Sequence, residues 1–149
     1  MALKARALGK QALILVPEIV LTGQLVTSFK EYFTDDVAVI HSRLSVGERN
    51  DTFWRIRTKQ IGIIIGARSA LFAPFEDLGL IVMDEEHDSS YKQDESPRYH
   101  SHDIIEKMAE IYHATLIMGS ATPSLESYYK AQIGEYVLLK MPNRIDNLP

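Results

Sequence analysis

Short runs of apolar, often β-branched residues alternate along the chain with segments in which apolar residues recur at helical spacing. This alternation is typical of a parallel sheet whose strands are joined by crossover helices. The predicted strands are residues 12–16, 37–41, 61–65, 80–84 and 115–118, with a further one at 136–139. We therefore expect an α/β fold, with a mostly parallel sheet flanked by helices.

The segments between these strands carry helix signals. Residues 22–33 and 101–112 have apolar stripes, and residues 1–9 resemble the end of an amphipathic helix. Ser45 with Glu48 has the pattern of a capping box in front of a helix that runs through residue 56. Thr122-Pro123 predicts another helix start, with the threonine as N-cap and the proline at the first helical position.

Composition narrows the class of protein. The 149 residues are 46% hydrophobic, which suits one domain, and the net charge of −4 gives no overall basic field for nucleic acid. The chain has no cysteine, so disulfides and thiolate metal sites are excluded. No apolar stretch approaches the ~20 residues of a membrane span, and the first residues do not show the apolar region and cleavage site of a signal peptide. We expect a soluble cytoplasmic protein without a membrane partner.

The apolar run of residues 78–83 ends in an acidic cluster, Asp84, Glu85, Glu86 and His87. The carboxyl edge of a parallel sheet is where α/β proteins carry out chemistry. Asp84 could hold a magnesium ion, usually through water, and Glu85 could take a proton from an attacking water. The neighbouring acids of this cluster repel one another. A bound cation or a basic partner therefore explains the cluster better than an exposed strand end does. His87 is a candidate phosphate sensor or a link to neighbouring loops.

These residues would make half of a nucleoside triphosphatase site. The other half is a phosphate loop, G-x-x-x-x-G-K-[ST], which the chain does not contain. Gly9-Lys10 is the only Gly-Lys pair, with Lys4 in place of the first glycine and Gln11 in place of the hydroxyl.

A small-residue loop, residues 119–122, follows the strand predicted at 115–118. Its hydroxyls could hydrogen-bond the acidic cluster and pass its state to the next helix, although a plain helix cap is the alternative. We assign this coupling to Glu86, Ser120, Ala121 and Thr122.

Nucleic-acid contacts are expected at three loops. Pro17 and Glu18 end the first strand, and Arg68 and Ser69 follow the third, where they could meet a phosphate. Residues 88–100 form a long polar connection that mixes aromatic and cationic side chains, as single-strand binding requires. Its candidate DNA contacts are Tyr91, Lys92, Gln93, Arg98 and Tyr99. An ordinary surface loop is the alternative.

A metal-dependent phosphoesterase is another alternative. His87, His100 and His102 could gather with Asp84, Asp88 and Asp103 around a transition metal. No recognised ligand spacing is present, which disfavours this reading.

The motifs, taken in order, closely resemble the PriA family of superfamily 2 DNA helicases. They are VPEI (16–19), LT (21–22), GARSALFAPF (66–75), DEEHDSSYKQ (84–93), RYH (98–100) and GSATP (119–123). The resemblance implies most of a RecA-like first helicase lobe of the P-loop NTPase type. It places the phosphate loop upstream of Met1 and the second lobe downstream of Pro149. Departures from the family pattern are Gly23, Arg43 and His102, the last of which usually is an arginine.

The resemblance implies a 3′ to 5′ helicase that remodels stalled forks and reloads the replisome, with ATP and Mg²⁺ as cofactors. Its zinc belongs to a family region absent from this chain. Asp84 and Glu85 would serve magnesium and water activation, while Ser120 and Thr122 would couple hydrolysis to motion. The implied partners are forked or single-stranded DNA, single-strand DNA-binding protein and other primosome proteins. Another superfamily 2 motor, or a non-catalytic binding module, stays open as an alternative.

Overall fold

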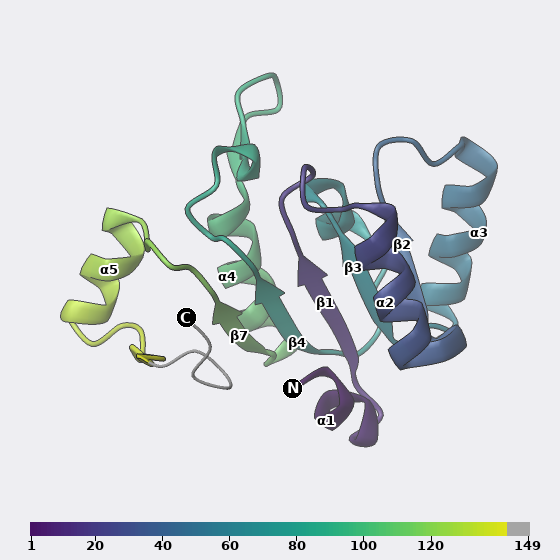
Figure 1. The fold of residues 1–149 in the computed structure, drawn as a ribbon, viewed down its shortest axis with the longest axis horizontal. Coiled ribbons are helices and arrows are strands. Elements are labelled where there is room, and N and C mark those ends of the chain that lie inside the picture. The colour runs from purple at the N-terminus through teal and green to yellow at the C-terminus, as the bar shows by residue number, and fades with distance from the viewer. Residues whose placement is uncertain (143–149) are drawn as a thin grey trace.

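The computed structural model describes residues 1–142, which fold around one five-stranded sheet (Figure 1). Its strands are β1 (Gln11–Leu15), β2 (Val37–Ile40), β3 (Ile63–Gly66), β4 (Leu78–Met83) and β7 (Thr115–Met118). They lie in the order β2-β3-β1-β4-β7, and every neighbouring pair is parallel. The α/β fold predicted from the sequence is confirmed. Because all strands point the same way, their carboxyl ends share one edge.

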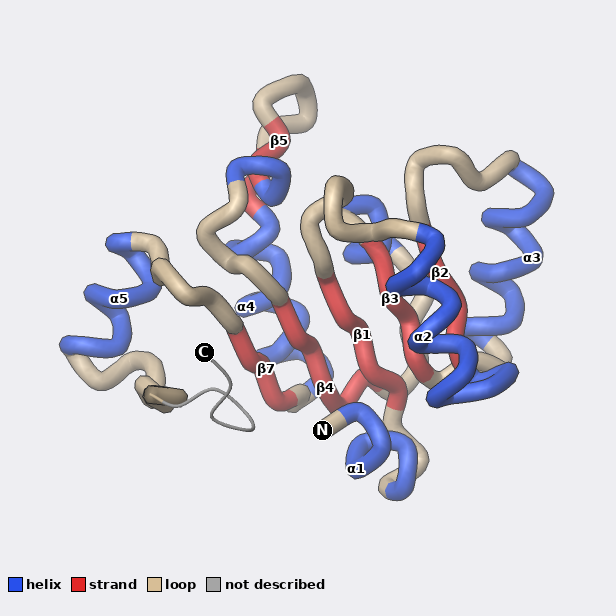
Figure 2. Tube along the Cα trace, in the orientation of Figure 1, coloured by secondary structure: helices blue, strands red, loops and turns tan. Residues whose placement is uncertain are grey.

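Helices cover both faces of the sheet (Figure 2). On one face α1 (Ala2–Ala7) and α2 (Gly23–Phe33) pack, and on the other α3 (Val46–Arg57) and α4 (Ser101–Tyr112). Side chains alternate between the faces, so Leu13 joins the cluster beneath α3 and α4, while Val16 joins the cluster beneath α2. Burial on both faces explains why these strands are continuous apolar runs.

Local signals predicted three of the helices well. Thr22 caps α2, and its hydroxyl accepts a hydrogen bond from the backbone N–H of Leu25. Ser45 and Glu48 form the predicted capping box of α3, with both reciprocal bonds present. The α4 helix has the predicted bounds, and strand ends differ from the prediction by one or two residues. Three short 3₁₀ helices complete this part of the chain: η1 (Thr34–Asp36), η2 (Arg68–Phe72) and η3 (Ser89–Tyr91).

Other predictions were wrong in position or type. The last helix, α5 (Leu125–Gln132), begins two residues later than predicted, and Ser124 rather than Thr122 is its N-cap. Residues 136–139 form no strand, because the Tyr136 hydroxyl bonds Glu106 and Lys130 beside the helices. The long connection at 88–100 contains a short antiparallel hairpin, β5 (Lys92–Gln93) and β6 (Tyr99–His100).

None of the helices described over residues 1–142 is long and apolar enough to cross a membrane.

Candidate functional site

The ends of three neighbouring strands meet around the acidic cluster, residues 84–87. The backbone N–H of Asp84 donates to the Leu15 carbonyl at the end of β1, 2.9 Å away. On the other side, the Gly119 N–H donates to the Met83 carbonyl at 2.8 Å, and the Glu86 N–H donates to the Gly119 carbonyl at 3.0 Å. The sheet order therefore places the cluster between the end of β1 and the loop of residues 119–122, as the sequence predicted for the latter.

Asp84 and Glu85 present their side chains at the edge of the sheet. Asp84 is exposed, and its Oδ1 accepts the Glu85 N–H at 3.0 Å. The Glu85 side chain is 44% exposed, and its Oε2 lies 3.6 Å from His87 Nδ1. Glu85 has a φ of 45°, a left-handed conformation that is costly for a residue with a side chain. Neither acid is sealed in an ion pair inside the fold.

Asp84 and Glu85 are compatible with the magnesium ion that the sequence predicts at this edge. Magnesium prefers oxygen ligands and keeps several waters, so an exposed carboxylate at an open sheet edge is a suitable donor. The loop that follows β7 lies close to Asp84, since a Cβ placed on Gly119 would be in van der Waals contact with Asp84 Oδ1, 3.7 Å away. The exposed Asp84 carboxylate is therefore chemically suited to the predicted magnesium ion.

Glu86 is turned the opposite way and is buried, with 2% of its side chain exposed. Burial raises the pKa of this carboxyl, but hydrogen bonds from Ser124, His102 and Ser127 outweigh burial and hold the pKa below its usual value. The Ser124 N–H donates to Oε1 at 2.6 Å, and His102 Nε2 lies 2.7 Å from Oε2. The carboxylate is thus charged and fixed between α4 and α5.

The link between the acidic cluster and the loop of residues 119–122 runs through His87. Its Nδ1 lies 2.7 Å from Ser120 Oγ, and the same hydroxyl accepts the Thr122 N–H at 3.0 Å. Of the two predicted hydroxyl contacts, only that of Ser120 is present, and its partner is His87 and not one of the carboxylates. Within residues 1–142 the Thr122 hydroxyl makes no hydrogen bond, and Ala121 and Thr122 are both exposed.

Tyr91 was predicted as a DNA contact, and this prediction is corrected by its burial. The side chain is fully buried and cannot stack on a base, because the hydroxyl points inward and donates to the Asp84 carbonyl at 2.7 Å. Burial, with Asp84, Asp88 and Glu85 nearby, raises the pKa of its phenol. Tyr91 instead joins the connection at 88–100 to the backbone of the acidic cluster.

Arg68 also has partners other than the predicted phosphate. Its Nη1 donates to the carbonyls of Ser90 and Lys92, and its guanidinium lies 5.8 Å from the centre of the Tyr99 ring. The Tyr99 ring packs edge-on against Phe72 at 5.6 Å. Arg68 and Tyr99 therefore dock the hairpin on η2.

The remaining predicted DNA contacts have varied exposure. Lys92 and Arg98 are exposed on the hairpin, Gln93 and Ser69 are half-buried, and Glu18 is exposed. Pro17 is buried, and Glu18 Oε1 accepts a hydrogen bond from the Ser42 hydroxyl at 2.5 Å. These residues come from several loops along the same carboxyl edge as the acidic cluster.

The alternative of a transition-metal cluster finds no support in residues 1–142. No three His, Cys, Asp or Glu side chains there gather as a metal site would require. His100 and His102 bond to each other and His102 bonds to Glu86, while His87 bonds to Ser120.

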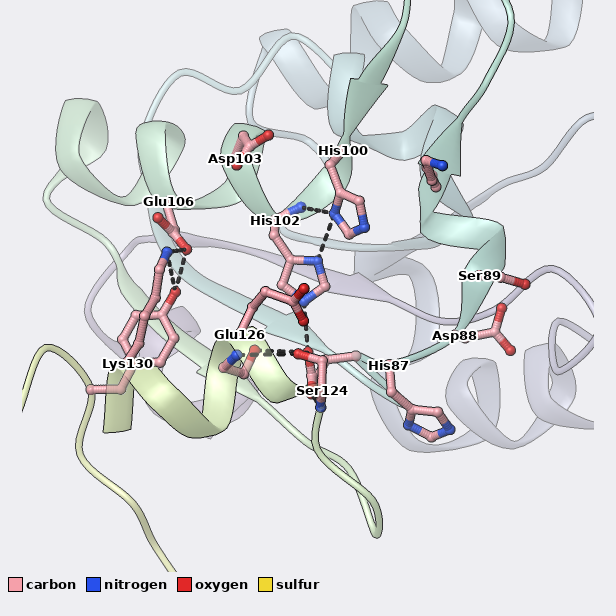
Figure 3. A pocket seen from close by; sticks show the side chains of 14 residues that line it. His87, Asp88, Ser89, His100, His102, Asp103, Glu106, Ser124, Glu126 and Lys130 are labelled. Carbon is pink, nitrogen blue, oxygen red and sulfur yellow. Dashed lines mark hydrogen bonds and ion pairs between the residues drawn. The ribbon is translucent and has the colours of Figure 1, made fainter. Parts of the chain in front are cut away.

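Sequence reasoning did not anticipate the partners of Glu86, nor the ion pair that lies beside them. Ser124 and Ser127 donate to Glu86, and His102 pairs with it, while Glu106 accepts from Lys130 and Tyr136 nearby. They line an open pocket of about 500 Å³ between α4, α5 and the acidic cluster (Figure 3). Among these residues, only the serines after Pro123 could have been suspected from the sequence. Serine is a common N-cap, and a helix start was predicted just before them.

Known proteins resemble the chain along nearly its whole length. Replication restart protein PriA of Bacillus subtilis (strain 168) is 52% identical over 144 residues, which are 97% of this chain and 18% of that protein. PriA of Chlamydia pneumoniae is 49% identical over 137 residues, 91% of this chain and 18% of that protein. PriA of Haemophilus influenzae is 49% identical over 139 residues, 93% of this chain and 19% of that protein.

The chain thus spans less than a fifth of the length of these curated relatives, and the resemblance to PriA predicted from the motifs is confirmed. A family model described as DEAD/DEAH box helicase matches residues 1–131. Because this match covers most of the sequence and includes the acidic cluster, the chain belongs to the DEAD/DEAH box helicase family.

Proposed function

We propose that the chain forms most of the first RecA-like lobe of an ATP-dependent 3′ to 5′ DNA helicase. This helicase would remodel stalled replication forks and reload the replisome in the cytoplasm. The observation that carries the proposal is the position of Asp84 and Glu85 at the carboxyl edge, between the end of β1 and the loop of residues 119–122. The likeness to replication restart proteins supports the cellular role.

In this proposal Asp84 holds Mg²⁺, directly or through water, and the ion when bound neutralises charge on the phosphates of ATP. Glu85 orients a water and accepts its proton, for which its half-exposed carboxylate is suitably open. His87 and Ser120 pass the state of the site to the loop of residues 119–122, since they already share a hydrogen bond.

The phosphates of ATP need further donors. Phosphoryl transfer depends on backbone amides and a lysine that cradle the β- and γ-phosphates. The 149 residues contain no G-x-x-x-x-G-K-[ST], so we propose that another part of the protein supplies this loop, as well as the second lobe. We therefore expect the isolated 149 residues to show no ATP hydrolysis. DNA-stimulated hydrolysis by the purified 149 residues would contradict this prediction.

Single-stranded or forked DNA is the proposed substrate. Lys92 and Arg98 are exposed cations on the hairpin and would pair with phosphates, with Gln93, Ser69 and Glu18 near them at the same edge. Single-strand DNA-binding protein and primosome proteins are the proposed partners, on the strength of the family resemblance alone.

The test is unwinding by the full-length protein that carries this chain. We expect ATP-dependent unwinding of forked DNA with 3′ to 5′ polarity, and ATP hydrolysis that rises when single-stranded DNA is added. RNA duplexes of the same sequence serve as the comparison. Preferential unwinding of RNA would favour another superfamily 2 motor, and binding without hydrolysis would favour a non-catalytic module. Either result would overturn the proposal.

A further inference from the structure

The strand β2 forms one end of the five-stranded sheet (Figure 1). Among the strands of residues 1–142 it pairs with β3 alone, so its outer edge presents unpaired backbone N–H and C=O groups. The four residues of the strand, Val37–Ile40, are all apolar and include neither a charged residue nor a proline, which commonly protect such an edge. The edge is therefore able to accept a further strand.

An open groove of about 260 Å³ lies against this edge, with walls from α2 and α3. Val26 of α2, Val39 of β2 and Leu44 form apolar parts of its lining, and all three are only partly buried. Apolar surface thus stays open to solvent beside the unpaired backbone groups. Nucleic-acid phosphates gain nothing from apolar surface, whereas an extended polypeptide buries it and also satisfies the backbone groups. The groove therefore suits a polypeptide.

Two cationic side chains line the groove from opposite helices. Lys30 of α2 is exposed, and Arg55 of α3 is half-buried. Neither forms an ion pair with any side chain that the structure describes. No described aspartate or glutamate lines the groove, so a negative charge placed there would be attracted to both cations. The groove is complementary in charge to acidic side chains.

The positions of the two cations also fit the geometry of a strand. The α2 helix packs on one face of the sheet and α3 on the other. Successive side chains of a strand alternate between the two faces. A strand added to β2 would therefore direct one side chain to the face of Lys30 and the next to the face of Arg55, so two adjacent acids would each meet a cation.

We propose that the edge of β2 is a docking site for an extended acidic segment of a partner protein, which adds to the sheet as a further strand. Backbone hydrogen bonds to β2 hold the segment, and adjacent acids pair with Lys30 and Arg55. The inference does not depend on the proposed ATPase function, because none of residues 84–87 lines this groove.

The test is binding of short fluorescent peptides to the full-length protein, measured by fluorescence anisotropy. The peptides place two adjacent glutamates among valines and threonines, and in a matched set lysines replace the glutamates. We expect the acidic peptides to bind and the lysine peptides not to bind.

Methylation of the peptide amides separates strand pairing from simple charge attraction. An added strand directs alternate residues' backbone groups toward β2. Methylation of one alternate set of amides should therefore abolish binding, whereas methylation of the other set should leave the affinity unchanged.

Substitution of the two cations tests the charge pairing. Lys30→Gln and Arg55→Gln should each weaken binding of the acidic peptides about threefold, and about tenfold together. Lys107→Gln is the matched control, because Lys107 is an exposed lysine of α4 that pairs with Glu110 and does not line the groove. We expect this variant to bind the peptides as the wild type does. The melting temperature of each variant checks that it is folded.

The inference is overturned if no acidic peptide binds, if the lysine peptides bind equally well, or if both methylated sets behave alike. Two other occupants would also overturn it. Single-stranded DNA binding that weakens in the Lys30→Gln and Arg55→Gln proteins, without peptide binding, would assign the groove to nucleic acid. A wild-type dimer that these substitutions dissociate, measured by analytical ultracentrifugation, would assign it to a second copy of the protein.

Discussion

At the scale of single residues, Tyr91 shows how a buried polar group supports the site. Its side chain is fully enclosed, its hydroxyl donates to the Asp84 carbonyl at 2.7 Å, and its own carbonyl accepts the Ser101 hydroxyl at 2.7 Å. A buried hydroxyl with one good partner stabilises the fold by about 1 kcal/mol. Tyr91 thereby holds the peptide that joins the two proposed catalytic acids.

The raised pKa of Tyr91 predicts an effect at alkaline pH. The folded state keeps the phenol protonated, whereas the unfolded chain ionises it near the ordinary value of 10.0. Because the unfolded state then binds fewer protons, the free energy of unfolding should be constant below that pH and fall above it. Tyr91→Phe should remove part of this fall, measured as the urea midpoint at about pH 8 and about pH 11. An equal fall in both proteins would contradict the prediction.

At the scale of elements, the helices and strands that depend on residues close together in the sequence were predicted correctly. The capping box of Ser45 and Glu48 spans three residues, and the apolar strands follow from burial on both faces, so both were visible in the pattern. The start of α5 was not visible, because its first free N–H is accepted by Glu86, which is 38 residues away along the chain. The strand predicted at residues 136–139 likewise failed because of distant contacts, since Tyr136 bonds Glu106 and Lys130.

The capping box allows a prediction at this scale. Ser45→Ala removes the hydroxyl that accepts the Glu48 N–H and should lower the free energy of unfolding by about 1 kcal/mol. The control is Ser28→Ala in the exposed middle of α2, which should cause no loss because alanine favours helix. Urea unfolding followed by circular dichroism measures both. Equal stability of Ser45→Ala and the wild type would show that the box contributes nothing.

At the scale of the whole molecule, the sheet order decides which loops meet. The sequence placed Asp84 and Glu85 at the end of a strand, but periodicity carries no information about which strands are neighbours. The order β3-β1-β4-β7 brings the ends of β1 and β7 to the two sides of the acidic cluster. The partners of Glu86 and the docking of Arg68 on the hairpin depend on this arrangement, and for that reason no motif predicted them.

The most direct test of the central claim is ATP hydrolysis by the full-length protein with Glu85→Gln or Asp84→Asn. Each change keeps the shape of the side chain but removes the charge that the proposed site requires. We predict that either variant unfolds at the wild-type temperature yet loses at least about 100-fold in DNA-stimulated kcat. Glu95→Gln, an exposed acid on the hairpin, is the control and should hydrolyse ATP as the wild type does. Near-normal hydrolysis by the Glu85→Gln and Asp84→Asn proteins would contradict the assignment of this edge as the ATPase site.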